Sequence, residues 1–497
     1  MTKPNVLFVM VDQMKATASS LYWGPACPTP NLSRLAERGV LYEHAFTPHP
    51  LCVPARVSVW RSQYPHTHGA RRNETMMPAD GRNAFRLWHE MGYRCGLIGK
   101  NHCFADDSDL RLFDTWCEIS HKGIPAGAGT RGMEWVRPVE SIRYAASVRR
   151  GMDFTNPKVS TAITDFPLQD YSTGLIAAQV EEYLANASSE PFALWVSFPD
   201  PHEPYETPRE YADLVSPESI VLPPWDPESF HATAPERNRV LHAMLGVPES
   251  DIADLVQAVR VYYANVRFID DAVGRILAAL DARGLRENTV VVFCSDHGDF
   301  AGEFRMTVKG GVFYDCLTRV PLLLSCPGTI PEGVRVSGMA NLVDVVPTLL
   351  ELQGAESPRW MQGRRLPFQD VVSGTDGPFS DAAFSEYGAG GKHFTFADLN
   401  QAEKPYGYRT IIDSLRWREA AGRRKMVRTA NWKYVHDPMG DVDELYDLTA
   451  DPWELRNLAG DPAYGDRVAE MSRRLADYSI LTEDPYPVPL PEATWRQ

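Results

Sequence analysis

The feature of this sequence that most constrains its fold is a series of short apolar runs separated by longer amphipathic stretches. Runs of strand length lie at residues 5–11, 94–99, 192–198, 289–294 and 320–325. Each is apolar at consecutive positions, which is typical of parallel strands that helices cover on both faces. The stretches between them show helical periodicity, and residues 252–280 indicate one long amphipathic helix or two shorter ones. The alternation predicts an α/β fold, with a large, mainly parallel or mixed sheet flanked by helices.

One helix start is marked clearly by its sequence. Thr29 precedes Pro30, and Leu32 and Leu35 then share a face before Gly39. Proline is favoured at the first position of a helix, and threonine is favoured at the position before it. We therefore expect a helix that begins at Pro30 and is capped by Thr29.

The pattern changes near residues 370–380. Short strand-like segments follow at residues 410–415, 425–430, 432–436 and 444–448. Turn residues separate them, and an amphipathic stretch at 467–475 comes last. These features predict a smaller antiparallel sheet with one helix. We therefore divide the chain into a larger unit, residues 1–375, and a smaller C-terminal α+β unit, residues 376–497.

Composition and charge exclude several classes of function. The 497 residues carry a formal net charge of −15, which disfavours nonspecific binding to nucleic acid or to an anionic membrane. The eight cysteines include no CxxC pair, so neither a disulfide framework nor a zinc ribbon is indicated. The apolar run at residues 6–11 is too short for a signal peptide, and no run reaches the roughly 18–20 residues of a membrane-spanning helix. We expect a cytoplasmic globular protein that binds neither nucleic acid nor membrane.

Polar side chains able to bind metal or transfer protons follow four of the predicted strands. They are Asp12-Gln13, Lys100-Asn101-His102, Asp200-Pro201-His202 and Ser295-Asp296-His297-Gly298-Asp299. One such residue alone more often caps a turn or a helix. Because the carboxyl ends of parallel strands lie at one edge of a sheet, where α/β proteins bind ligands, we expect these groups to meet there. Three oxygen donors and one imidazole suit Ca²⁺, Mg²⁺ or Mn²⁺. The candidate metal ligands are Asp12, Gln13, Asp296 and His297.

The most specific motif surrounds Cys52, in the sequence Cys52-Val53-Pro54-Ala55-Arg56. It resembles the sulfatase family, whose signature is Cys-x-Pro-Ser/Ala-Arg near the N-terminus. An isolated cysteine is more often a small buried hydrophobe. Here the order of the aspartate pairs around it also follows the family, and further blocks match along nearly the whole chain. Those blocks are residues 29–32, Gly99-Lys100-x-His102, His202, Lys309, Trp432-Lys433-Tyr434, residues 444–448, Asp451-Pro452 and Asn457-Leu458.

The resemblance implies a sulfuric ester hydrolase close to bacterial arylsulfatases, with an alkaline phosphatase-like catalytic domain in residues 1–375. In the family the motif cysteine is oxidised to formylglycine, whose hydrated aldehyde is the nucleophile on a divalent metal. Cys52 would therefore be the nucleophile position and join the metal ligands, and Arg56 would steady the diol. The metal would be Mn²⁺ or Ca²⁺, with Mg²⁺ as a third option.

The same resemblance implies roles for residues further along the chain. Lys100 and Lys309 would hold sulfate oxygens. His102 would be the base that releases sulfate, and His202 would contact the leaving-group oxygen as its acid. Asn73, shortly after the motif, is a further candidate for substrate binding.

This chain departs from the common sulfatase pattern at three positions. Gln13 stands where many sulfatases have a second aspartate, His297 where many have asparagine, and Ala55 where serine is frequent. In these respects the chain resembles the phosphonate monoester hydrolase and phosphodiesterase branch of the alkaline phosphatase superfamily. Lys100 and His102 resemble the sulfatases instead. We therefore expect sulfate monoesters as substrates, with side activity on phosphonate monoesters and phosphodiesters.

Two further alternatives stay open. Choline sulfatase is similar around Gly99-Lys100-x-His102, but it needs an aromatic or acidic cage for a quaternary ammonium group. A catalytically silent binding protein would keep the fold with Cys52 unmodified. The partners that the resemblance implies are a small-molecule sulfate ester, a formylglycine-generating enzyme for maturation, and further copies of the chain in a homodimer or homotetramer.

Overall fold

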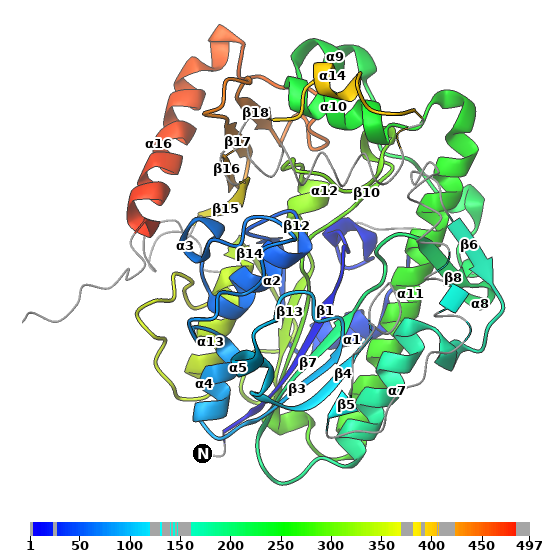
Figure 1. Cartoon of the computed structure of the whole chain (residues 1–497), viewed down its shortest axis with the longest axis vertical. Helices are drawn as coiled ribbons and strands as arrows, with labels where there is room; N and C mark the ends of the chain where they lie inside the picture. Colours follow the sequence, from blue (N-terminus) through cyan, green and yellow to red (C-terminus); the bar gives the residue numbers. More distant parts are fainter. Residues whose placement is uncertain are drawn as a thin grey trace, which may run out of the picture.

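Figure 1 shows the computed structural model of the chain, in which helices lie on either side of a central sheet. The structure describes residues 3–22, 27–119, 130–131, 161–368, 381–388, 393–404 and 423–483, with the single positions 140, 143, 144, 147 and 406. Within these residues the predicted α/β architecture is confirmed, and a small antiparallel sheet follows the large sheet along the chain.

The large sheet contains ten strands of the described chain in the order β12-β2-β13-β9-β1-β7-β3-β4-β5, with β14 paired to β2. Their bounds are β1 Asn5–Val11, β2 Val40–Phe46, β3 Arg94–Gly99, β4 Phe113–Glu118, β5 Thr130–Arg131, β7 Phe192–Phe198, β9 Thr289–Ser295, β12 Arg319–Val320, β13 Leu322–Ser325 and β14 Val334–Asn341. The central strands from β9 to β4 run parallel. Because β13 pairs antiparallel to both β9 and β2, the sheet is mixed, with its parallel part at the centre.

Most of the apolar runs form the strands that the sequence predicts, namely β1, β3, β7 and β9. The prediction for residues 320–325 is wrong in part, because they do not form one parallel strand. Pro321 has no backbone N–H to donate to a ladder, and the segment divides there into β12 and the antiparallel strand β13. Residues 252–280 belong to one continuous helix, α11 (Ile252–Ala282).

Helices cover both faces of the sheet because its central strands are apolar on both sides. In β1 the odd-numbered side chains from Leu7 to Val11 pack into the core with α1, α7 and α11. The even-numbered side chains from Val6 to Met10 pack into the opposite core with α2, α4 and α13. The helices named here are α1 Pro30–Glu37, α2 Cys52–Arg61, α4 Ala84–Glu90, α7 Ser172–Ala185 and α13 Val345–Leu352. Burial on both sides holds β1 firmly, so the residue after Val11 has a defined place at the sheet edge.

Helix α1 begins at Pro30, as predicted, but within the described chain Thr29 does not cap it. The Thr29 hydroxyl lies 2.7 Å from Ser19 Oγ instead. The backbone N–H groups of Asn31 and Leu32 donate to the Asp270 carboxylate on α11, at 3.1 Å and 2.8 Å. A carboxylate from a packed helix thus replaces the local cap, and sequence spacing does not reveal such a partner.

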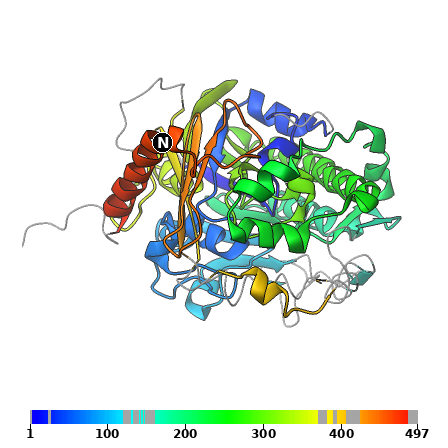
Figure 2. The same cartoon turned by 90° about the horizontal axis from the view of Figure 1, so that it is seen from above.

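The strands described near the C-terminus form the small antiparallel sheet. They are β15 Ala382–Tyr387, β16 Arg424–Thr429, β17 Trp432–His436 and β18 Glu444–Asp447. Helix α16 (Gly465–Thr482) packs on this sheet through Met471, Leu475 and Tyr478, and Figure 2 shows it at one side of the molecule, away from α11. The predicted sheet and helix are confirmed, while residues 410–415, which the sequence predicts as a strand, lie outside the described residues.

The remaining elements are short connections, apart from a helix pair that precedes α11. They are η1 Ala16–Ala18, α3 Pro65–His68, α5 Asp107–Leu110, β6 Thr161–Thr164, η3 Leu168–Asp170, β8 Tyr205–Pro208, α8 Arg209–Ala212, η4 Pro217–Ser219, α9 Pro227–Thr233, α10 Glu236–Leu245, η5 Glu249–Asp251, η6 Arg286–Asn288, β10 Phe300–Ala301, η7 Glu303–Arg305, β11 Thr307–Val308, α12 Asp315–Thr318, η8 Leu342–Asp344, α14 Phe396–Leu399 and η10 Pro462–Tyr464. Across the described residues, no helix combines the length and the apolar character needed to cross a membrane.

Candidate active site

The carboxyl edge of the central strands brings several predicted site residues together. β1 and β9 are parallel neighbours in register, so Asp12 and Asp296, the residues just beyond them, lie side by side. Asp12, Cys52, Asp296 and His297 each place one candidate ligand atom within 4.8 Å of the others, and all four residues are buried. We call these four residues the edge cluster.

Cys52 enters the edge cluster as the first residue of α2, and it is only 1% exposed. Its Sγ lies 3.1 Å from His297 Nε2 and 3.5 Å from Asp12 Oδ1. Asn73, which the sequence suggests as a substrate contact, lies at the same helix start, where its Oδ1 accepts a hydrogen bond of 3.1 Å from Val53 N. No carbonyl of the helix itself can reach that N–H. Asn73 therefore holds the backbone beside Cys52.

Arg56, in the second turn of α2, joins the two carboxylates of the edge cluster. Its Nη2 donates to Asp12 Oδ2 at 2.9 Å, and its Nε donates to Asp296 Oδ2 at 2.8 Å. Its Nη1 donates to Lys100 O at 3.0 Å and to Ser197 Oγ at 2.9 Å. The guanidinium is completely buried. A buried arginine bonded to both carboxylates sets their positions, because any movement would leave a charge unpaired.

Lys100 and His102 lie beyond the end of β3 at the same edge. Lys100 Nζ donates to the Asp12 carboxylate. Burial alone would raise the pKa of Asp12, but the Lys100 ammonium and the Arg56 guanidinium hold it well below its usual range. Burial, together with the charges of Lys100 and Arg56, also holds the pKa of His102 well below its usual range. At neutral pH Asp12 is therefore a carboxylate, and His102 is a neutral imidazole.

Gln13, His202 and Lys309 form a second group beside the edge cluster. Lys309, which follows β11, places its Nζ 2.7 Å from His202 Nε2 and also donates to Gln13 Oε1. Gln13 N donates to Asp296 Oδ1 at 3.1 Å, which attaches this group to the cluster. Gln13 has a φ of 70°. A residue with a side chain pays for this left-handed conformation in backbone energy, and such residues concentrate at functional sites.

The donor atoms of the edge cluster suit a divalent cation. Two carboxylates and one imidazole, with the Gln13 amide beside them, are the hard and borderline donors that Mn²⁺, Ca²⁺ and Mg²⁺ accept. Burial would lower the pKa of His297, but the Asp296 carboxylate and Cys52 raise it to about 9. This attraction for positive charge is what a cation site requires, because a metal ion takes the place of the ring proton. The residues present therefore fit the predicted cation.

Three buried polar residues at this edge have no role in the sequence-based predictions. Ser197 lies inside β7, Glu203 accepts a hydrogen bond of 2.8 Å from Gln13 Nε2, and Asp299 accepts one of 2.8 Å from the Tyr205 hydroxyl. Burial and the nearby Glu203 carboxylate hold the pKa of Asp299 well above its usual range. Asp299 had a signal, since it belongs to the polar run after β9. Ser197 and Glu203 had none.

Asp200 follows β7 but, in the described part of the chain, does not join the edge cluster. Its Oδ2 accepts hydrogen bonds from Ser172 Oγ at 2.8 Å and from Thr173 Oγ1 at 2.5 Å, both in the first turn of α7. The expectation that every polar strand end contributes to the site is therefore wrong for Asp200. It has the structural role that a strand-end aspartate more often has.

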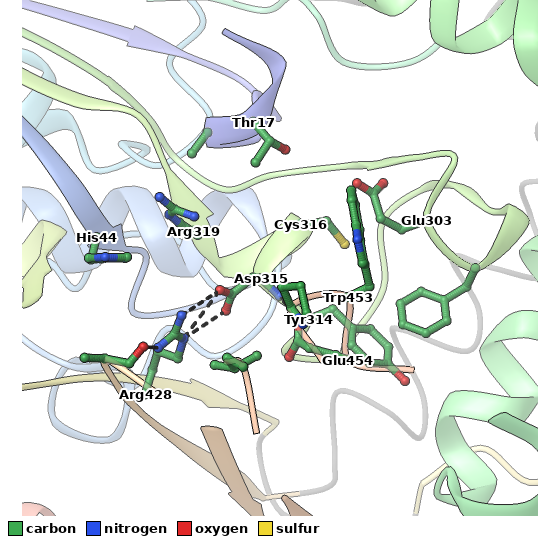
Figure 3. A pocket seen from close by; sticks show the side chains of 15 residues that line it. Thr17, His44, Glu303, Tyr314, Asp315, Cys316, Arg319, Arg428, Trp453 and Glu454 are labelled. Atoms are coloured by element: carbon green, nitrogen blue, oxygen red, sulfur yellow. Dashed lines mark hydrogen bonds and ion pairs between the residues drawn. The ribbon is translucent and has the colours of Figure 1, made fainter. Parts of the chain in front are cut away.

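A charged cluster attaches α12 to the C-terminal sheet, and Figure 3 shows its contact between Arg428 and Asp315. Arg428 of β16 donates to Asp315 Oδ2 at 3.2 Å, and Lys433 Nζ of β17 lies 2.6 Å from Asp315 Oδ1. The Asp315 backbone N donates to Glu454 Oε2 at 2.6 Å. Asp315, Arg428 and Glu454 border a cavity of about 220 Å³, which Arg319 also lines.

Helix α12 in turn packs against the loop that follows β9. Gly298 N donates to Leu317 O at 2.8 Å, and Asp299 N donates to Cys316 O at 3.0 Å. A Cβ atom at Gly298 would lie 1.9 Å from Cys316 O, so no other residue fits this close approach. The C-terminal sheet thus supports, through α12, the loop of residues 296–299.

Replacing Asp315 with alanine should destabilise the fold by about 3–5 kcal/mol, because Arg428 would be left as a buried charge without its carboxylate and Lys433 would keep only Glu454. Urea unfolding of the purified variant measures this loss. Asp281→Ala is a matched control, since the Asp281 side chain is 50% exposed, and it should stay within about 0.5 kcal/mol of wild type. Equal stability of the two variants would show that the cluster does not hold α12.

The fold and the edge cluster define an α/β enzyme in which a helix-borne cysteine lies within a candidate cation site. Residues 4–355 match the family model described as Sulfatase. The chain therefore belongs to the sulfatase family, as its motifs predict, and is an enzyme of the sulfuric ester hydrolase type. Residues 302–411 also match the model described as N-sulphoglucosamine sulphohydrolase, C-terminal.

The chain is similar over nearly its whole length to several named relatives. It is 27% identical to the ulvan-active sulfatase of Formosa agariphila, an alignment that covers 96% of this chain and 82% of the relative. It is 28% identical to the choline-sulfatase of Rhizobium meliloti, covering 93% of this chain and 83% of the relative. Its fold matches the phosphonate monoester hydrolase of Agrobacterium radiobacter with a TM-score of 0.74, at 23% identity, over 96% of each chain.

Proposed function

We propose that this protein hydrolyses sulfate monoesters to an alcohol or phenol and sulfate, with Cys52 matured to formylglycine and one divalent cation bound beside it. The observation that carries the proposal is the position of Cys52 Sγ, 3.1 Å from His297 Nε2 within a buried set of candidate metal ligands. Formylglycine would supply a nucleophilic oxygen there, and the cation would lower its pKa and neutralise charge. The proposed ligands are Asp12, Gln13, Asp296, His297 and matured Cys52.

Four side chains around the edge cluster are suited to bind and protonate a sulfate ester. Lys100 contacts Asp12 and Lys309 contacts Gln13, and each can neutralise nonbridging sulfate oxygens as charge develops on them. His202, with Lys309 beside its Nε2, is the proposed acid for the leaving oxygen. His102 is the proposed base from the family resemblance, and a neutral imidazole keeps one nitrogen lone pair as an acceptor. Arg56 acts by holding Asp12 and steadying the nucleophile position.

The ligand set supports Mn²⁺ more strongly than Ca²⁺. An imidazole nitrogen at position 297 suits Mn²⁺ better than Ca²⁺, in comparison with a site made only of oxygen donors. Neutral Gln13 also leaves the site with one carboxylate fewer than a pair of aspartates would supply. Every proposed site residue lies within residues 1–375, which supports the proposal that this larger unit is catalytic.

The second candidate function is hydrolysis of phosphonate monoesters or phosphodiesters. The neutral Gln13 and the structural likeness to a phosphonate monoester hydrolase favour it. These substrates carry about one negative charge, as sulfate monoesters do, so electrostatics alone separates the classes weakly. Choline sulfate is a narrower candidate substrate, suggested by the choline-sulfatase relative.

The substrate class is tested by comparing kcat/KM for an aryl sulfate, an aryl phosphonate monoester and an aryl phosphodiester, with choline sulfate as a fourth substrate. The protein should be produced together with a formylglycine-generating enzyme, and the mass of the Cys52 peptide should confirm conversion. We expect the aryl sulfate to be preferred. Preference for the phosphonate or the diester would replace our proposal with the second candidate, and no turnover by converted protein would support a binding role.

Lys100→Ala and His102→Ala should reduce kcat/KM for the aryl sulfate by about 10²–10³-fold, as expected when a charge-stabilising or proton-transferring group is lost. Loss on the phosphodiester should be smaller, because we assign this pair to sulfate. Lys3→Ala is the control, since Lys3 is an exposed lysine. Equal losses on both substrates would remove our reason for preferring a sulfatase.

A further inference from the structure

The carboxylate of Glu203 lies between two proposed site residues and is completely buried. Gln13 Nε2 donates to Glu203 Oε2 at 2.8 Å, and His202 Nδ1 lies 3.1 Å from the same oxygen. Lys309 Nζ lies 4.0 Å from this oxygen. One carboxylate oxygen therefore faces an amide, an imidazole and an ammonium group that all belong to the site.

These contacts determine how the two neighbours are oriented. An ionised carboxylate has no proton to donate, so Gln13 must turn its nitrogen toward Glu203. The Gln13 oxygen then lies on the other side of the amide, where it accepts from Lys309. His202 Nδ1 also donates to the Glu203 carbonyl oxygen at 2.7 Å. The Nδ1 atom therefore carries a proton, and Nε2 is the nitrogen that faces Lys309.

We propose that Glu203 is a positioning residue that holds His202 with Nε2 toward the leaving oxygen and keeps the Gln13 oxygen available as a metal ligand. The inference rests on the proposed sulfate-ester hydrolysis. In the absence of substrate Nε2 accepts from Lys309; when Lys309 turns to the sulfate oxygens of a bound ester, Nε2 takes a proton from water and the ring becomes an imidazolium. When the bond between sulfur and the leaving oxygen then breaks, its electron pair stays on that oxygen, which takes this Nε2 proton. The ring then remains neutral with its Nδ1 proton held by Glu203. A carboxylate at Nδ1 stabilises the imidazolium before this transfer.

The same arrangement explains the neutral residue at position 13. An aspartate there would place a second carboxylate against Glu203, with no proton to share between them. The glutamine amide instead donates to Glu203 and still presents an oxygen. The negative charge that a second aspartate would carry lies instead on Glu203, which accepts the hydrogen bond of the Gln13 amide.

The dependence of rate on the leaving group tests the hold on His202. Glu203→Gln should lower kcat for unactivated phenyl sulfate by about 10–100-fold, the usual effect of losing a group that orients a functional histidine. The same variant should lower kcat for 4-nitrophenyl sulfate by less than about threefold, because a good leaving group needs little protonation. Glu203→Asp keeps the charge on a shorter arm and should fall between wild type and Glu203→Gln.

Glu206→Gln is the matched control, because Glu206 lies three positions along the chain, is half-buried, and accepts a hydrogen bond of 3.1 Å from Thr164 Oγ1. It should change the two rates equally or leave them unchanged. In a His202→Gln background, Glu203→Gln should have no further leaving-group effect, which a double-mutant cycle measures. A purely structural role for Glu203 would slow both esters alike.

Metal affinity tests the hold on Gln13 without any turnover. We expect Glu203→Gln to weaken Mn²⁺ binding by about tenfold in a chelator competition, using protein whose Cys52 is unconverted. The assignment to His202 is overturned if wild type is active and Glu203→Gln slows both esters equally or slows neither. Unchanged Mn²⁺ affinity would overturn the assignment to Gln13. If wild type hydrolyses neither ester, the proposed function fails by itself, and the affinity measurement still decides the role of Glu203 toward Gln13.

Discussion

Replacing Cys52 with alanine is expected to abolish sulfate-ester hydrolysis while the protein stays folded. The expected loss in kcat is about 10⁴-fold or more, as for other enzymes that lose their nucleophile. The fold should persist because the Asp12–Arg56–Asp296 contacts do not involve the thiol. Steady-state rates with an aryl sulfate, together with circular dichroism and thermal unfolding, measure both parts of this expectation.

Cys326→Ala is the matched control for Cys52→Ala. Cys326 is also a buried free thiol, but it lies just after β13, away from the carboxyl edge of the parallel strands. Its loss removes a similar apolar volume, so any general effect of a small cavity appears in both variants. Full activity of Cys52→Ala would exclude position 52 as the nucleophile. Equal inactivation by Cys326→Ala would point to a folding defect.

Replacing Asp296 with asparagine should remove the bound cation and most of the activity. Asp296 is the centre of the edge cluster, where it accepts hydrogen bonds from Arg56 Nε at 2.8 Å and from the backbone N of His297 at 2.9 Å. Asparagine keeps the shape of the side chain but loses its negative charge, so the site attracts a cation less strongly. Metal affinity should fall by more than about 100-fold, beyond the effect of losing a residue that only supports a ligand.

Elemental analysis of the purified protein, before and after dialysis against a chelator, measures this loss of metal. Asp165→Asn is the control, because the Asp165 side chain is 65% exposed and pairs with Arg209. It should bind as much metal as wild type. Unchanged metal content in Asp296→Asn would place the cation elsewhere in the molecule.

The parts of the fold and site that the sequence predicts depend on local patterns and on one rule of topology. Buried apolar runs identify β1, β3, β7 and β9, and the carboxyl ends of parallel strands share an edge. Asp12 and Asp296 can therefore be placed side by side although they are far apart in the sequence. The hydrogen bond from the neighbouring Gln13 N to Asp296 Oδ1 spans 283 positions. The Cys52 motif identifies the family independently of this topology.

The parts that the sequence does not predict depend on partners that are distant in the chain. Asp270 caps α1 in place of Thr29 because α11 packs across the helix start. Glu203 reaches Gln13 only once β1 and β7 are neighbours, and no spacing rule connects the two residues. The division of residues 320–325 follows from Pro321, whose effect on strand pairing depends on which neighbours the strand has.

The attachment of α12 to the C-terminal sheet has a consequence for how this enzyme is made. On the ribosome, every proposed site residue emerges well before Arg428 and Lys433, whose contacts with Asp315 hold α12 in place. A nascent chain at that stage has the loop of residues 296–299 but not the support that α12 gives it. We expect the site to close only when the last strands fold. Until then Cys52, which is 1% exposed in the finished protein, would be accessible to the proposed formylglycine-generating enzyme.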